Sequence, residues 1–144
     1  MLKQSIITEI TIDASREKVW EILVDYDNYH TWNPFCIKAE TTKEIGTPFV
    51  MTIQMHPGKK PIKSKEIYSD HEAPKVIGWR LNWGFLLKTH RLQVLEKVDE
   101  HTTHYFTEDK FWGLLTPLVM FLYRKPIQRG FDETAAALKA VCEK

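Results

Sequence analysis

The chain has 144 residues, 43% of them hydrophobic and 27% charged, which is typical of one globular domain and excludes a disordered chain. Its net charge of +1 gives no argument for a nucleic-acid partner or an acidic substrate. Aromatic residues make up 12% of the chain, which suits a large core or an apolar pocket equally well. We predict a single domain over residues 1–144.

The first elements are predicted from alternation and capping. Apolar side chains at even positions from Ser5 to Ile12 predict a strand, and Ser15 is a suitable N-cap for a helix from about Arg16 to Val24. A second short helix should end before Pro34, since the residue before a proline is pushed out of helical geometry. The connection that follows, TWNPF, is aromatic where a surface loop is usually polar.

Strands separated by short turns are predicted between residues 37 and 112, and the short turns favour antiparallel neighbours. Alternation predicts strands near residues 49–55, 77–83, 90–94 and 102–112, with a polar strand over 63–68. His90 shares the parity of its apolar neighbours and is predicted to point inward, whereas Arg80 and Arg91 are predicted to be surface charges. The inward face of 102–112 stays open, because aromatic residues occur on both faces.

A long helix is predicted to end the chain. Thr116 and Pro117 suit a helix start, and apolar residues then recur at helical spacing as far as Cys142. Pro126 should kink or break this helix. A sheet with one apolar face needs a cover, and here the only long cover is this helix, so the space between them is either a packed core or a cavity.

Four segments carry a resemblance that runs nearly end to end: TIDASREKVWEILVDYDNYHTWNPF, VIGWRL, KTHRLQVLE, and FWGLLTPL leading into RGFDETAAALKAV. Their order and spacing resemble the START/Bet v 1-like superfamily, also called the SRPBCC or polyketide cyclase/dehydrase group. The resemblance implies an α+β helix-grip fold. In this fold a bent antiparallel sheet of about seven strands wraps round the C-terminal helix, two short helices follow the first strand, and an apolar cavity lies inside. It does not specify a function, because the superfamily includes binders, carriers, enzymes and chaperone regulators.

The leading hypothesis is a non-enzymatic protein that binds a small hydrophobic or amphipathic molecule, such as a lipid, isoprenoid or polyketide, in that cavity. His90 would orient the ligand, and Trp32 is expected to act more as a core plug than as a contact. The expected lining residues are Trp32, Phe35, Met51, Ile53, Trp79, Leu81, Trp83, His90, Leu92, Phe106, Val119 and Tyr123.

Two alternatives remain open. One is a cyclase- or dehydratase-like enzyme that uses His90 with Tyr105 or Glu108 as proton donor and acceptor. The other is a protein-binding regulator of the chaperone-activating kind. No Ser-His-Asp order, phosphate-binding glycine loop or close carboxylate pair is found. His101 and His104 lie across a turn and a strand start, where residues three apart face opposite ways, so neither a metal nor another cofactor is predicted.

The expected location is the cytoplasm. Cys36 and Cys142 show no disulfide or metal spacing, and the N-terminus lacks the continuous apolar segment of a signal peptide. The longest apolar run, Pro117 to Tyr123, is far shorter than the roughly 20 residues that span a bilayer, so no stable membrane insertion is expected. Residues 114–123 should be core, with transient contact with anionic lipid through the basic residues beyond them as the alternative.

Overall fold

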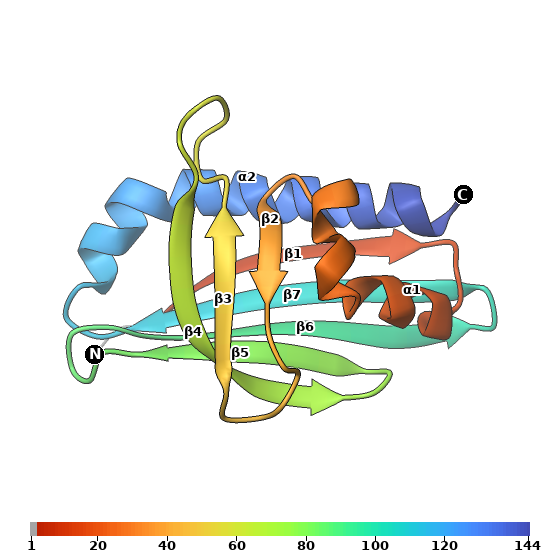
Figure 1. Ribbon diagram of the computed structural model, residues 1–144, viewed down its shortest axis with the longest axis horizontal. Coiled ribbons are helices and arrows are strands. Elements are labelled where there is room, and N and C mark those ends of the chain that lie inside the picture. The colour runs from red at the N-terminus through yellow and green to blue at the C-terminus, as the bar shows by residue number, and fades with distance from the viewer. Residues whose placement is uncertain (1–2) are drawn as a thin grey trace.

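The computed structural model describes residues 3–144, so residues 1 and 2 of the predicted domain lie outside the described residues. A curved sheet grips one long helix (Figure 1). The elements in chain order are β1 (Gln4–Ile12), α1 (Arg16–Leu23), the 3₁₀ helix η1 (Tyr26–Thr31), β2 (Cys36–Glu40), β3 (Pro48–Ile53), β4 (Ile62–Glu72), β5 (Val76–Asn82), β6 (Lys88–Asp99), β7 (Thr102–Trp112) and α2 (Thr116–Cys142).

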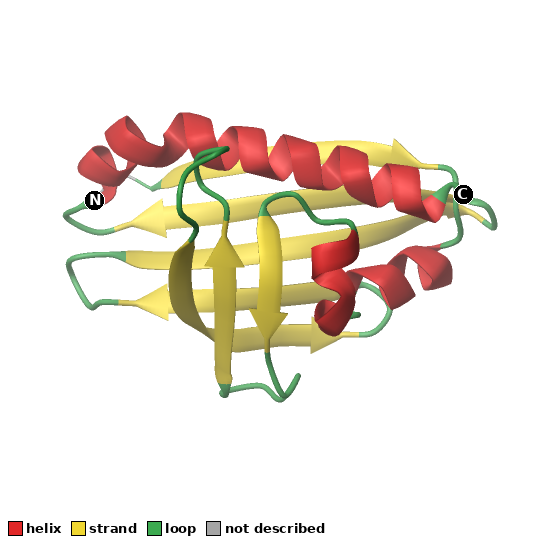
Figure 2. Ribbon diagram, turned by 45° about the horizontal axis from the view of Figure 1, so that its top comes forward, coloured by secondary structure: helices red, strands yellow, loops and turns green. Residues whose placement is uncertain are grey.

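The seven strands form one sheet in the order β1-β7-β6-β5-β4-β3-β2, and every neighbouring pair is antiparallel. Figure 1 shows β2 and β3 running across the direction of β1, β7, β6 and β5, so that the sheet curls round α2. Figure 2 shows α1 and η1 near the C-terminal end of α2, where they close one end of the sheet. The predicted helix-grip fold, with two short helices after the first strand, is confirmed.

The first strand and helix follow the predicted signals. The even positions of β1 face the core, and Ile6 and Ile12 are completely buried. Ser15 caps α1, because its Oγ accepts a hydrogen bond from the backbone N–H of Lys18 at 3.2 Å. A local alternation and a local cap are therefore enough to define this part of the fold.

The two faces of β6 are the reverse of those predicted. Arg91 is only 7% exposed and lines the interior, so the prediction of a surface charge is wrong. His90 lies on the outer face, because consecutive residues of a strand point to opposite sides. Its Nε2 lies 2.7 Å from Oδ1 of Asp70. The pattern misled because the inner face of β6 is itself largely polar, with buried Thr89, Arg91 and Gln93.

The inward face of β7 is now assigned. Tyr105 and Phe111 are buried, and Asp109 faces the interior with them. By the same alternation, Phe106 and Glu108 lie on the outer face.

The helix α2 is continuous through Pro126, so the proline does not end it. Figure 1 shows the first turns of α2 inclined to the rest of the helix. This is the kink expected where a proline removes one backbone hydrogen bond and crowds the preceding turn.

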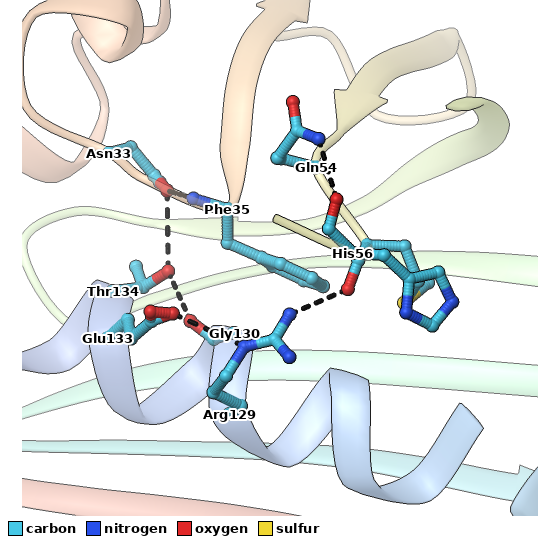
Figure 3. A network of polar contacts seen from close by, with 9 residues as sticks. Asn33, Phe35, Gln54, His56, Arg129, Gly130, Glu133 and Thr134 are labelled. Atoms are coloured by element: carbon cyan, nitrogen blue, oxygen red, sulfur yellow. Dashed lines mark hydrogen bonds and ion pairs between the residues drawn. The ribbon is translucent and has the colours of Figure 1, made fainter. Parts of the chain in front are cut away.

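The aromatic connection after η1 packs onto α2 (Figure 3). Oδ1 of Asn33 accepts hydrogen bonds from the backbone N–H groups of Phe35 and Cys36, both at 2.9 Å, which turns the chain into β2. The ring of Phe35 lies edge-on to Phe131, with the ring centres 6.0 Å apart. Gly130 allows this approach, because a Cβ there would lie 2.2 Å from the Phe35 ring. The loop is therefore aromatic because it covers the long helix.

Candidate functional site

A cavity of about 170 Å³ lies between α2 and the curved sheet. Most of its wall is apolar, with a polar group of side chains on β4, β6 and β7. The wall is formed by Phe35, Met51, Ile53, Met55, Ile62, Ser64, Glu66, Trp79, Leu81, Leu87, Thr89, Arg91, Asp109, Phe111, Ile127 and Phe131.

Several of the predicted lining residues do line this cavity. They are Phe35, Met51, Ile53, Trp79 and Leu81. Apart from Phe35, they come from the inward positions of β3 and β5, whose alternation the sequence shows clearly. Trp79 also stacks on Phe49, with ring centres 4.2 Å apart, so the core holds its indole in place.

The other predicted lining residues are not in the cavity wall. They are Trp32, Trp83, His90, Leu92, Phe106, Val119 and Tyr123. Trp32 packs edge-on against Tyr29, as a core plug would. Trp83 is 57% exposed beyond the end of β5, and Tyr123 is exposed on α2. Val119 packs on the core outside the cavity wall. His90, Leu92 and Phe106 lie on the outer face of the sheet, away from the cavity.

The side chains predicted for catalysis lie outside the cavity wall. His90 and Glu108 lie on the outer face of the sheet, where Glu108 is 4.0 Å from the ammonium group of Lys110. Tyr105 is buried, but its hydroxyl donates to Gln93 and it does not line the cavity. None of these three side chains therefore lines the cavity.

The structure instead brings together Glu66, Arg91 and Asp109, which the sequence interpretation missed. Arg91 and Asp109 are directly opposite each other on β6 and β7. The guanidinium group of Arg91 lies over the ring of Phe131, 3.9 Å from its centre, and its Nε donates to Oγ1 of Thr107 at 3.1 Å. The cation is held in place by an aromatic face and a hydroxyl, and no salt bridge to it is found within residues 3–144.

Both carboxyl groups are harder to ionise than usual. Burial raises the pKa of Asp109 to about 8, the negative charge of Glu66 adds to this, and Arg91 opposes it. Burial also raises the pKa of Glu66. The hydrogen bond from Ser64, the charge of Arg91 and the hydrogen bond from Thr89 each lower this pKa, but by less. At neutral pH, Asp109 is therefore mainly a protonated acid that can donate a hydrogen bond.

Two polar atoms of this group have no hydrogen-bond partner among the described residues. Nη2 of Arg91 and Oδ1 of Asp109 are buried, and neither forms a hydrogen bond within residues 3–144. A buried polar atom left unpaired costs about 1–3 kcal/mol, so such atoms are few in native proteins. These two atoms can bind a polar group of a molecule that enters the cavity.

A contact between α2 and the loop that joins β3 to β4 lies beside Met55, one of the residues of the cavity wall (Figure 3). Nη2 of Arg129 donates to the backbone carbonyl of Met55 at 2.7 Å, and its Nε lies 3.4 Å from Glu133. Gln54 holds the same loop by donating to the carbonyl groups of His56 and Lys59. Within the described part of the chain, no group of three or more His, Cys, Asp and Glu side chains is placed to hold a metal ion.

Solved structures of similar fold include the Zhui aromatase/cyclase from Streptomyces sp. R1128, with 16% identity and a TM-score of 0.76 over 99% of this chain and 94% of that one. A START superfamily protein from Mycobacterium smegmatis has 15% identity and a TM-score of 0.74, over 96% and 97%. Norcoclaurine synthase from Thalictrum flavum, solved with dopamine and hydroxybenzaldehyde, has 14% identity and a TM-score of 0.71, over 97% and 86%. At such identities these likenesses show the fold alone.

No curated protein matches the chain. The family described as "Polyketide cyclase / dehydrase and lipid transport" matches residues 3–143, which is almost the whole sequence. The chain therefore belongs to the polyketide cyclase/dehydrase and lipid transport family.

Proposed function

We propose that the protein binds a small, mainly apolar molecule that carries one carbonyl, phenol or carboxylate group. The observation that supports this most strongly is the buried, unpaired Nη2 of Arg91 beside Asp109 in an otherwise apolar cavity. A guanidinium group and a protonated acid are both donors, so together they suit an oxygen that accepts two hydrogen bonds. The apolar part of the ligand would lie against Met51 and Trp79.

The size of the cavity favours a ligand of about one ring. An engineered cavity of about 150 Å³ in another protein binds benzene, and the cavity here measures about 170 Å³. A long lipid or a polyketide would exceed this volume unless the cavity widened. Norcoclaurine synthase was solved with two one-ring molecules, so 4-hydroxybenzaldehyde, which has a ring and a carbonyl, is a suitable first probe.

Replacing Arg91 with methionine is expected to weaken binding of 4-hydroxybenzaldehyde by about tenfold, because the stronger donor to its oxygen is lost. Methionine keeps an apolar contact with Phe131 and removes the buried charge. Calorimetry gives the affinity, and amide NMR shifts show whether the probe lies in the cavity. Arg80→Met is the matched control, because Arg80 is exposed on the outer face of β5. Equal affinities for wild type and R91M would contradict the proposal, as would a probe that shifts no cavity residue.

A second function, that of a cyclase- or dehydratase-like enzyme, is favoured by the presence of two carboxyl groups in the same cavity. Arg91 and protonated Asp109 could stabilise the negative oxygen of an enolate, as preorganised donors do in other enzymes. Ionised Glu66 could accept the proton from the neighbouring carbon. The regulator alternative requires no cavity, so it gains no support here.

The enzyme alternative predicts exchange of a carbon-bound proton with solvent. Wild type should accelerate deuterium uptake by acetylacetone in heavy water, and Glu66→Gln should reduce that acceleration by about a hundredfold, as is usual on loss of a general base. Proton NMR follows the exchange, and Glu108→Gln on the outer face is the control. If wild type binds 4-hydroxybenzaldehyde but does not accelerate this exchange, the enzyme alternative is wrong and only the binding function stands.

A further inference from the structure

A group of exposed apolar side chains lies at one end of the molecule, away from α1. We call it the apolar end patch, and its members are Phe85, Leu86, Leu114, Leu118, Phe121 and Leu122. Phe121 is 86% exposed and Phe85 is 74% exposed. Single exposed apolar residues are ordinary, but several together are not, so this patch needs an explanation.

The patch is continuous, because its two loops are joined to each other. The backbone N–H of Leu114 donates to the carbonyl of Phe85 at 2.9 Å, and that of Leu115 donates to the carbonyl of Leu86 at 2.8 Å. Leu118 and Leu122 are four residues apart and therefore share one side of α2. Figure 1 shows the start of α2 at the same end of the molecule as the β5–β6 and β7–α2 connections.

The two segments that carry the patch have charges of one sign only. Residues 73–95 and 110–131, which contain the whole patch, include no Asp or Glu but several Lys and Arg residues. Lys125 is exposed and lies four residues beyond Phe121, on the same side of the helix. Arg124 lies half-buried next to it, where it donates to the side chain of Gln4. The segments that carry the patch are therefore cationic.

We propose that the apolar end patch docks the protein on an anionic lipid surface. Exposed Phe and Leu side chains with flanking Lys and Arg are the composition of segments that lie in a membrane interface. A second copy of the chain is a poorer occupant, because a symmetric contact would bring Lys125 of both copies together. No helix within residues 3–144 is long and apolar enough to cross a membrane, so the contact is peripheral.

The patch also borders the cavity. Leu87, which lines the cavity, directly follows Leu86 of the patch, and Ile127 of the wall follows Leu122 by little more than one helical turn. Docking would hold this side of the cavity against the lipid. The docking proposal itself requires no cavity ligand, and it can be tested on the protein alone.

The test is sedimentation with vesicles of phosphatidylcholine, with and without about a quarter of phosphatidylglycerol. Wild type is expected to sediment with the anionic vesicles, more strongly at low salt. Phe121→Ser should weaken this binding by at least about tenfold through loss of apolar burial. Lys125→Glu should weaken it by about fivefold or more, through loss of attraction to the anionic surface.

The matched controls are Val98→Ser and Lys18→Glu, which replace an exposed apolar and an exposed basic residue elsewhere on the surface. Both should bind as wild type does. Sedimentation velocity without lipid shows whether Phe121→Ser alters self-association. Failure of wild type to sediment with anionic vesicles, or equal binding by F121S, would overturn the proposal. A dimer that F121S disrupts, with no vesicle binding, would assign the patch to a second copy and overturn it too.

Discussion

Replacing Asn33 with alanine is expected to lower the free energy of unfolding by about 3 kcal/mol. The Asn33 side chain is 6% exposed, and its Oδ1 accepts from the backbone N–H groups of Phe35 and Cys36. Alanine would leave both donors buried and unpaired, and each such donor costs about 1–3 kcal/mol. The change would also loosen the contact of Phe35 with α2.

Urea unfolding followed by tryptophan fluorescence measures this change, provided that the slope with denaturant is unaltered. Thr134→Val is the matched control, because Thr134 donates to the same Oδ1 only at 3.3 Å and bonds more closely to the carbonyl of Gly130, at 2.7 Å. This substitution should lower the free energy of unfolding by less than about 1.5 kcal/mol. An N33A protein that is no less stable than T134V would show that water replaces the lost acceptor.

Replacing Asp109 with asparagine is expected to stabilise the protein by about 2 kcal/mol at neutral pH. The pKa of Asp109 is about 8 in the folded protein, against about 3.9 in an unfolded chain. Between these values the unfolded chain loses its proton and the folded one keeps it, so the contribution of Asp109 to stability falls as the pH rises from about 4 to about 8. The full shift corresponds to about 4 kcal/mol at pH 7, but the side chain is only half-buried, which reduces the effect.

The difference in unfolding free energy between D109N and wild type should therefore be small near about pH 4 and reach its maximum above about pH 8. Glu66→Gln should lower the pKa of Asp109, because it removes a neighbouring negative charge, and carboxyl NMR measures this directly. Asp99→Asn is the control with the opposite sign, because the backbone hydrogen bond from His101 lowers the pKa of that carboxyl. A difference that does not grow with pH would contradict the assignment of a protonated Asp109.

The sequence pattern correctly predicted which side chains point inward on strands with an apolar inner face. On strands with a polar inner face, the same pattern gave the wrong face or none. Met51 and Trp79 follow a plain alternation, and the structure places them where the pattern indicated. Arg91 was predicted to be at the surface, because a basic residue in a strand is normally exposed. Its burial depends on Phe131 of α2 and Thr107 of β7, which are distant in the sequence and become neighbours only in the fold.

The polar part of the cavity was hidden for the same reason. Glu66 alternates with lysines in a strand that reads as solvent-exposed, although Ser64 and Tyr68 on its own face point inward. Asp109 has the parity of Tyr105 and Phe111, but aromatic residues on both faces of that strand left its direction open. A rule that compared neighbouring strands in register would have placed Asp109 opposite Arg91.

The contact between Arg129 and the carbonyl of Met55 has a bearing on rates of ligand exchange. It joins α2 to the β3–β4 loop beside the cavity, whose wall includes Met55, Arg91 and Asp109. If a ligand enters past this contact, breaking it raises the barriers to entry and to exit equally, so the contact slows exchange without altering the equilibrium. For a ligand of the proposed kind, Arg129→Met should therefore speed both binding and release, by about tenfold at most, and leave the affinity unchanged.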